Sequence, residues 1–193
     1  MMQTIEEIQQ HVLRGEPVQI IGNNSQLKSS LTNTLSMSHY AGLIDYHPEE
    51  LVMMVKGGTK ISELTHILDA KDQALPFTVQ GGDNATIGGA YAIGSPALRD
   101  AVLGVKIIDG KGQILNFGGQ VMKNVAGYDV TRMLVGSRGK LAVICEVSFR
   151  VLPKSYITQS NSPTAKINSV DSTIKQNIEH GLKHVFDPNG VFV

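Results

Sequence analysis

The chain has a single cysteine, no excess of charge of either sign and no long apolar run, and each shortage excludes a class of protein. Cys145 has no partner for an internal disulfide, which is typical of a reducing compartment. Seventeen basic residues balance seventeen acidic ones, so no net field attracts nucleic acid or an anionic membrane. No apolar stretch approaches the roughly 18 residues that span a bilayer, and the acidic start does not resemble a signal peptide. We therefore expect a cytoplasmic protein without a transmembrane segment.

Glycine, by contrast, is abundant and clustered. Of 193 residues 20 are glycine, in a chain whose 41% hydrophobic and 18% charged content is that of a globular protein. Several glycines come in pairs, at 57–58, 81–82, 88–89 and 118–119. Paired glycines are typical where a backbone takes positive φ or comes close to another backbone or a ligand. The sequence leaves both interpretations open.

The spacing of apolar residues predicts an α+β fold with mixed sheets and flanking helices. Strands are expected at residues 18–21, 43–46, 51–55 and 141–151, the last half-buried, and residues 101–117 read as a hairpin. Helices are expected at residues 4–14, where Thr4 and Glu7 form a capping box, and at 59–68 and 128–135, with Thr59 and Asp129 as caps.

The chain is expected to form a single domain over residues 1–193, with approximate subdomains 1–73 and 74–153. A polar stretch at residues 154–171, rich in Ser, Asn and Thr, predicts a surface linker. The linker leads into a C-terminal helix over residues 172–186, whose expected apolar face is formed by Ile174, Ile178, Leu182 and Val185.

Two loops of small residues, 22–26 and 81–89, are candidates for an anion site. Each follows an extended segment, and such loops can direct several backbone N–H groups at one anion. Two loops that close on one diphosphate would suit a dinucleotide. Neither loop matches the Rossmann or P-loop glycine pattern, so the common nucleotide folds are disfavoured. Tight turns without a ligand remain the alternative.

Four segments carry a resemblance to a known family. They are Thr86-Ile87-Gly88-Gly89 and the stretches at residues 98–106, 117–130 and 136–141. Together they resemble the FAD-linked oxidases of the vanillyl-alcohol-oxidase and p-cresol-methylhydroxylase type, in particular the FAD-binding subunits of bacterial glycolate oxidases. Residues 185–192 resemble the C-terminal signature of that family.

The resemblance implies a two-subdomain α+β fold with FAD between the halves. Backbone N–H groups of the first loop and of the T-I-G-G segment would hold the diphosphate, and the G-S-x-G-x-L stretch would follow the ribityl and adenosine portion. The implied cofactor-binding positions are Gly22, Asn23, Asn24, Ser25, Gly81, Gly82, Ala85, Thr86, Gly88, Gly89, Gly136, Ser137, Gly139 and Ile144. The implied function is flavin-linked oxidation of a 2-hydroxy acid in a complex with a second flavoprotein and an iron–sulfur protein.

The sequence departs from the family pattern at three places. The first loop reads Gly22-Asn23-Asn24-Ser25-Gln26 where the family has G-G-G-[ST]-K. The connection at residues 90–98 is short, and Asp83 adds a negative charge to the second loop. The cap domain that follows the last strand in the family is absent. The first two departures favour an alternative function, a degenerate domain that has lost FAD and serves as a scaffold or interaction subunit, whereas the stretch at residues 117–139 favours the flavin-linked function. Without a cap, either a partner subunit closes the site or no substrate binds.

The remaining candidates favour structural roles. His180 and His184 have a spacing that could bind a metal, but no third ligand with supporting spacing is visible, so we expect exposed helix residues and no metal site. Cys145 alternates with apolar residues and is expected to face the core. Lys123 and Arg132 could face a carboxylate or a phosphate, although solvated cations are commoner. No catalytic residue is assigned.

Overall fold

The computed structural model describes residues 4–23, 33–119, 129–157 and 172–193, apart from the side chains of residues 172 and 175. Helix α1 (Ile5–Leu13) begins at the predicted capping box. The Thr4 hydroxyl accepts the Glu7 amide at 3.2 Å, and the Glu7 carboxylate accepts the Thr4 amide at 3.2 Å. Ile8 and Val12 are buried, which confirms the amphipathic helix.

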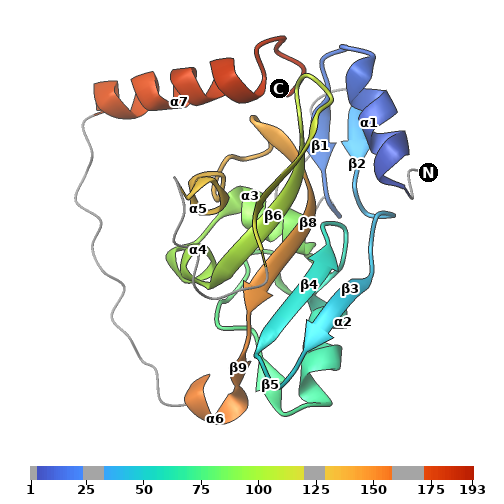
Figure 1. Ribbon diagram of the computed structural model, residues 1–193, viewed down its shortest axis with the longest axis vertical. Helices are drawn as coiled ribbons and strands as arrows, with labels where there is room; N and C mark the ends of the chain where they lie inside the picture. Colours follow the sequence, from blue (N-terminus) through green and yellow to red (C-terminus); the bar gives the residue numbers. More distant parts are fainter. Residues whose placement is uncertain (1–3, 24–32, 120–128, 158–171) are drawn as a thin grey trace.

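The mixed α+β fold is built around a five-stranded antiparallel sheet of order β3-β4-β8-β6-β7 (Figure 1). Strands from both sides of residue 73 share this sheet, because the first two belong to the N-terminal part of the chain. The predicted strands and hairpin are confirmed as β3 (Leu43–His47), β4 (Val52–Lys56), β6 (Val102–Asp109), β7 (Ile114–Gly118) and β8 (Ala142–Arg150).

The central strand β8 is buried on both faces, so the expectation of a half-buried strand is wrong. One face packs against helices α2 (Ile61–Asp69), α3 (Ile87–Ile93), α4 (Pro96–Ala101) and α5 (Val130–Met133) in the larger core cluster. On the other face Val143 and Cys145 pack against α1 and the C-terminal residues Val191 and Phe192. The residues that cover this second face come from the two ends of the chain, so the sequence of the strand alone does not reveal that the face is covered.

Of the caps predicted for α5 and α2, the first is confirmed and the second is wrong. Asp129 accepts the Arg132 amide at 3.0 Å and caps α5 as predicted. Thr59 does not cap α2, which begins after Lys60 without a side-chain cap. The Thr59 hydroxyl instead donates to the Lys56 carbonyl at 2.7 Å and accepts the Gly42 amide at 2.9 Å. A tertiary partner outcompetes the local cap at this position.

A small parallel sheet pairs β1 (Gln19–Ile21) with β2 (Thr34–Ser36). The C-terminal tail extends it, since Val18 bridges Phe192 in parallel and donates its amide to the Val191 carbonyl at 2.8 Å. The last residues of the chain therefore hold the strand that leads into residue 22.

The remaining elements lie at the ends of the molecule. A short pair, β5 (Gln73–Ala74) and β9 (Leu152–Pro153), precedes α6 (Lys154–Ile157), so the first residues of the predicted linker are helical and residues 158–171 lie outside the described parts. Helix α7 (Ser172–Phe186) covers the predicted range at the opposite end (Figure 1). Its predicted apolar face is largely not buried: only Leu182 packs against the core, and the rest of that face is exposed, at Ile174, Ile178 and Val185.

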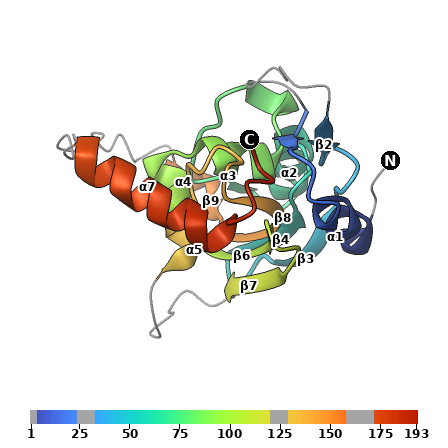
Figure 2. The same ribbon diagram turned by 90° about the horizontal axis from the view of Figure 1, so that it is seen from above.

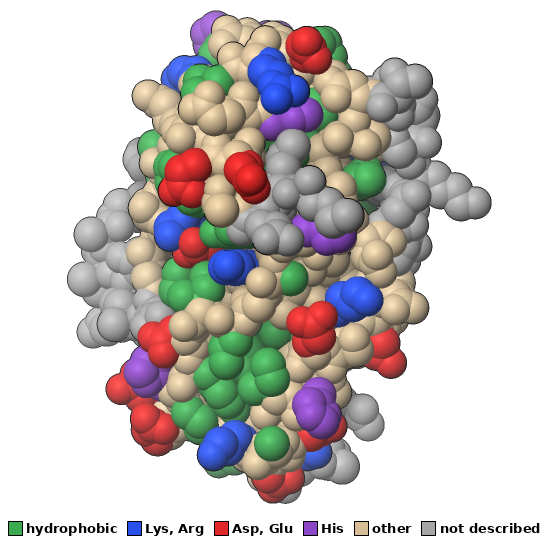
Figure 3. Space-filling model, turned by 90° about the vertical axis from the view of Figure 1, so that its right-hand side faces the viewer, with side chains coloured by type: hydrophobic (Ala, Val, Ile, Leu, Met, Phe, Trp, Pro, Cys, Tyr) green, Lys and Arg blue, Asp and Glu red, His purple; other side chains and the backbone are tan. Residues whose placement is uncertain are grey.

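Figure 2 shows that α7 extends away from the body of the protein and that its C-terminal end lies against that body. Acidic, basic and histidine side chains are interspersed on the face seen in Figure 3, consistent with the zero formal charge. Within the described residues no helix combines the length and apolarity needed to cross a bilayer.

Candidate functional site

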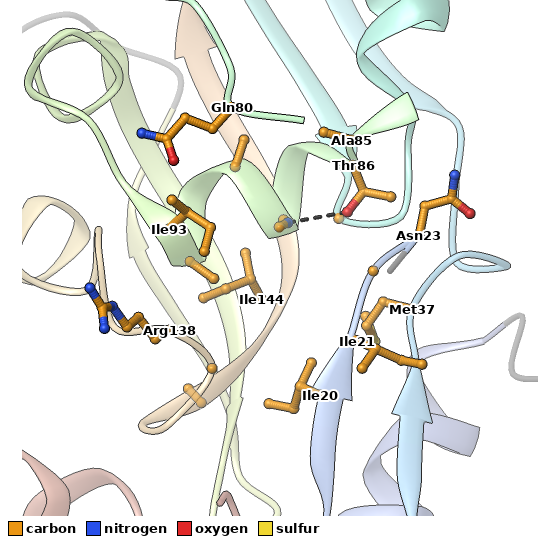
Figure 4. A pocket seen from close by; sticks show the side chains of 18 residues that line it. Ile20, Ile21, Asn23, Met37, Gln80, Ala85, Thr86, Ile93, Arg138 and Ile144 are labelled. Atoms are coloured by element: carbon orange, nitrogen blue, oxygen red, sulfur yellow. Dashed lines mark hydrogen bonds between the residues drawn. The ribbon is translucent and has the colours of Figure 1, made fainter. Parts of the chain in front are cut away.

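A largely apolar cleft runs between β1 and the layer formed by α3 and β8 (Figure 4). The cleft is partly open to solvent, and its cavity volume is about 70 Å³. The cleft is lined by Ile20, Ile21, Gly22, Asn23, Met37, Gly57, Gln80, Ala85, Thr86, Gly88, Gly89, Ala90, Ala92, Ile93, Arg138, Gly139, Ala142 and Ile144.

Thr86 joins the two walls of the cleft. Its hydroxyl accepts the Gly89 amide at 3.2 Å and so caps α3. On its other side Gly22 comes so close that a Cβ placed there would lie 2.4 Å from the Thr86 hydroxyl oxygen. Glycine at position 22 therefore lets the end of β1 approach the start of α3, which fixes the width of the cleft.

The backbone amides of the T-I-G-G segment donate to groups of the protein itself. The Ile87 amide donates to the Thr59 carbonyl at 2.9 Å, and the Gly88 amide donates to the Gly57 carbonyl at 2.8 Å. A Cβ at position 88 would lie 2.8 Å from that carbonyl oxygen, so this glycine serves close backbone packing. The amides expected to hold a diphosphate are thus engaged within the chain, and the predicted phosphate contact stays a prediction.

Asn23 links the two small-residue loops. Its side-chain amide donates to the Asn84 carbonyl at 3.0 Å, across 61 residues of chain. Figure 4 shows it at one end of the cleft. Asp83, the acidic residue of the second loop, is exposed and is not among the lining residues. The side chain of Asn23 therefore braces the loops and does not plug the cleft between them.

The loop at residues 136–139 closes the other end of the cleft. Its backbone has positive φ at Gly136, Arg138 and Gly139, of +90°, +55° and +75°. The Gly136 amide donates to the Tyr91 carbonyl at 3.0 Å, and the Arg138 amide donates to the Ala92 carbonyl at 2.8 Å. The loop is therefore held against the C-terminal half of α3.

A half-buried ion pair joins the neighbouring strands β6 and β8. The Glu146 carboxylate accepts the Lys106 ammonium at 2.7 Å and the Tyr40 hydroxyl at 3.1 Å. Burial, followed by the neighbouring Glu146 charge, raises the pKa of Tyr40 well above its usual range. The bond fixes the turn that carries Met37 into the cleft.

The structure brings together eight of the fourteen positions implied by the resemblance. Lining the cleft are Gly22, Asn23, Ala85, Thr86, Gly88, Gly89, Gly139 and Ile144. Four lie near it without lining it: Gly81, Gly82, Gly136 and Ser137. Asn24 and Ser25 lie outside the described residues. A role in cofactor binding remains a prediction for all fourteen.

Sequence reasoning missed the apolar walls and the cation of the cleft. The lining residues that had not been predicted are Ile20, Ile21, Met37, Gly57, Gln80, Ala90, Ala92, Ile93, Arg138 and Ala142. Ile20 and Ile21 form an apolar strand, a pattern that equally well describes core. The paired glycines at 57–58 were the one available signal, because pairing marks close approach of some kind.

The described residues do not form a metal site or a reactive thiol. No group of three potential metal-ligating side chains occurs in the described ranges, and His180 and His184 are exposed on α7. Cys145 is fully buried, as predicted, and burial raises the pKa of its thiol to about 12.

The comparisons identify the class of protein: the chain belongs to the FAD binding domain family, which it matches over residues 3–118. It is 40% identical over 162 residues to the glycolate oxidase subunit GlcE of Escherichia coli K12, an alignment that covers 78% of this chain and 46% of the relative. Identity to the glycolate oxidase subunit GlcD of Bacillus subtilis is 28%, over 74% of this chain and 32% of the relative.

A third relative is the mitochondrial D-lactate dehydrogenase [cytochrome] of Arabidopsis thaliana, 31% identical over 62% of this chain and 23% of the relative. The chain thus spans less than half the length of the curated relatives it matches. The matched family is described as an FAD binding domain, and these relatives are named for glycolate and for D-lactate, which are both 2-hydroxy acids. The recognition made from the motifs is confirmed.

Proposed function

We propose that this chain binds FAD in the cleft between β1 and α3 and serves as a subunit of an oxidoreductase that acts on a 2-hydroxy acid. The observation that carries the proposal is the cleft itself, whose walls meet where Gly22 abuts Thr86. Both residues lie within the segment matched to the FAD binding domain family. Relatives named for glycolate and for D-lactate support this substrate class.

The residues of the cleft fit the flat ring systems of a dinucleotide. Ile20, Met37 and Ile144 offer apolar surface for ring systems, and the glycines among the lining residues add no side-chain bulk. The buried Ser137 hydroxyl, next to the lining residue Arg138, has no hydrogen-bond partner among the described residues, which supports a ligand near this loop. When bound, FAD supplies a ring that accepts a hydride. The chain's own contribution is to bind, orient and shield that ring.

The proposal includes partner subunits. Two of the relatives, GlcE of Escherichia coli and GlcD of Bacillus subtilis, are named as subunits of glycolate oxidase. We therefore propose that a second flavoprotein subunit and an iron–sulfur subunit complete the enzyme and carry electrons onward. The competing function, a scaffold without FAD, draws support from the intrachain hydrogen bonds of the Ile87 and Gly88 amides.

The first experiment is to titrate the purified, desalted chain with FAD. Binding is followed by flavin fluorescence and by thermal unfolding, because a ligand that binds only the folded state raises the melting temperature. At a hundredfold excess of FAD over Kd the gain is about 2.7 kcal/mol. For a chain of this size that gain corresponds to about 5–10 °C. A melting temperature that does not change when FAD is added would support the scaffold function instead.

A matched pair of variants locates the site. Ala92 lines the cleft on α3, whereas Ala97 is exposed on α4 and does not line it. Ala92→Leu should weaken FAD binding at least about tenfold by filling the cleft, and Ala97→Leu should leave it unchanged. Bleaching of bound flavin by glycolate or D-lactate without oxygen, alone and with candidate partner subunits present, then tests the substrate class.

A further inference from the structure

We propose that Arg138 supplies the positive charge that holds the diphosphate of the dinucleotide, an inference that rests on the proposed function. Among the described residues that line the cleft, Arg138 is the one with a charged side chain. It is exposed, and no hydrogen bond or ion pair of its guanidinium occurs within the described parts of the chain. Figure 4 shows it at the end of the cleft opposite Asn23.

Three of the other expected donors are already engaged. The amides of Ile87, Gly88 and Gly89 donate to protein acceptors at 2.8–3.2 Å. FAD carries its negative charge on the diphosphate, and an apolar cleft binds such a charge poorly unless a counter-charge faces it. A guanidinium suits this task, because its planar donors can engage two phosphate oxygens at once.

The backbone at Arg138 points the same way. Its φ of +55° is a left-handed conformation that non-glycine residues rarely adopt, and glycines stand at positions 136 and 139 of the same loop. The hydrogen bond from the Arg138 amide to the Ala92 carbonyl, 2.8 Å long, holds this conformation. Disfavoured conformations concentrate at ligand sites, where the side chain they present has a use.

The test compares ligands that differ in charge. FAD, ADP, adenosine and riboflavin are titrated against wild type, Arg138→Asn and Arg138→Lys at about 0.05 M and about 0.5 M NaCl. Asparagine tolerates left-handed backbone and removes the charge, whereas lysine retains it. Lys140→Gln is the control, since Lys140 is an exposed cation nearby that does not line the cleft.

Arg138→Asn should weaken FAD and ADP about tenfold at low salt and less at high salt, while adenosine and riboflavin binding stay unchanged. Arg138→Lys keeps the charge but loses the two-point geometry, so its FAD affinity should lie between those of wild type and Arg138→Asn. The FAD affinity of Lys140→Gln should equal that of wild type. Arg138→Gly should raise the melting temperature by relieving the backbone while it weakens FAD, a combination that a merely structural arginine would not give.

Two results overturn the proposal. Unchanged FAD affinity in Arg138→Asn would show that the charge is not used. An equal loss for adenosine would show that the guanidinium stacks on a ring. If the wild-type protein bound none of the ligands, both the proposed function and this inference would fail. If it bound FAD but Arg138→Asn bound FAD equally well, only this inference would fail.

Discussion

Replacing Asp187 by alanine should unfold the C-terminal tail and destabilise the whole domain. The Asp187 side chain has no solvent exposure and lies at the turn after α7. Its carboxylate accepts the Val191 amide at 2.8 Å, the Phe192 amide at 2.8 Å and the Lys183 ammonium at 2.5 Å. Both amides are buried, so no water replaces the lost acceptor.

The magnitude follows from these three bonds. Each buried amide left without an acceptor costs about 1–3 kcal/mol, and the ammonium loses its carboxylate as well. The expected loss is therefore about 3–5 kcal/mol, a large part of the ~5–15 kcal/mol that stabilises a typical domain. The melting temperature should fall by about 10 °C. Asp187→Asn keeps one acceptor oxygen and should lose about half as much.

The Asp187→Ala substitution should also affect the cleft. The tail holds Val18, whose amide donates to the Val191 carbonyl, and Val18 leads directly into β1 and Gly22. We expect weaker FAD binding in Asp187→Ala even well below its melting temperature, because β1 loses its outer partner.

The assay is urea unfolding followed by far-ultraviolet circular dichroism, with and without FAD. Asp100→Ala is the control, since Asp100 is exposed on α4, and it should stay within about 0.5 kcal/mol of the parent. An Asp187→Ala protein that unfolds within the same margin would refute the role given to the carboxylate.

Two further predictions concern the core and the glycines. Cys145, buried with a thiol pKa of about 12, should resist alkylation at about pH 8 in the native protein and react at once in urea; rapid native labelling would contradict the burial. Gly57→Ala should cost at least about 3 kcal/mol, because its Cβ would lie 2.3 Å from the Ile144 carbonyl oxygen. Gly181→Ala, on an exposed turn of α7 with open space, should stabilise by about 0.5–1 kcal/mol; similar thermal shifts for the two would disprove the packing argument.

Local signals predicted the elements well where the local partner also wins in the fold. The Thr4 capping box, the β6–β7 hairpin and the Asp129 cap all depend on residues within a few positions. The cap predicted at Thr59 was wrong for the opposite reason, because the Thr59 hydroxyl bonds to Gly42, 17 residues away. The range predicted for α7 is confirmed, but most of its apolar stripe is exposed. Periodicity reports that a face is apolar, and packing decides whether it is covered.

The candidate site was predictable only in part, because it gathers short contributions from distant segments. Glycine clusters and a family motif located Gly22, Thr86 and Gly139. Ile20 reads as a core strand residue and Arg138 as a solvated cation, and nothing in their neighbourhoods distinguishes a cleft wall from either. The distinction arises from the approach of β1 to α3, which is a tertiary fact.

The close packing of glycines and the binding of a ligand are not competing explanations here. The Gly57 amide donates to the Cys145 carbonyl at 2.6 Å, and its carbonyl accepts the Gly88 amide at 2.8 Å. A side chain at either position would push α3 away from β8, since each Cβ would lie under 3.0 Å from a backbone oxygen. Helix α3 would then lift off the sheet and the cleft would lose its wall. Small residues in this chain shape the cleft by close backbone packing, and Gly57 and Gly88 themselves line it.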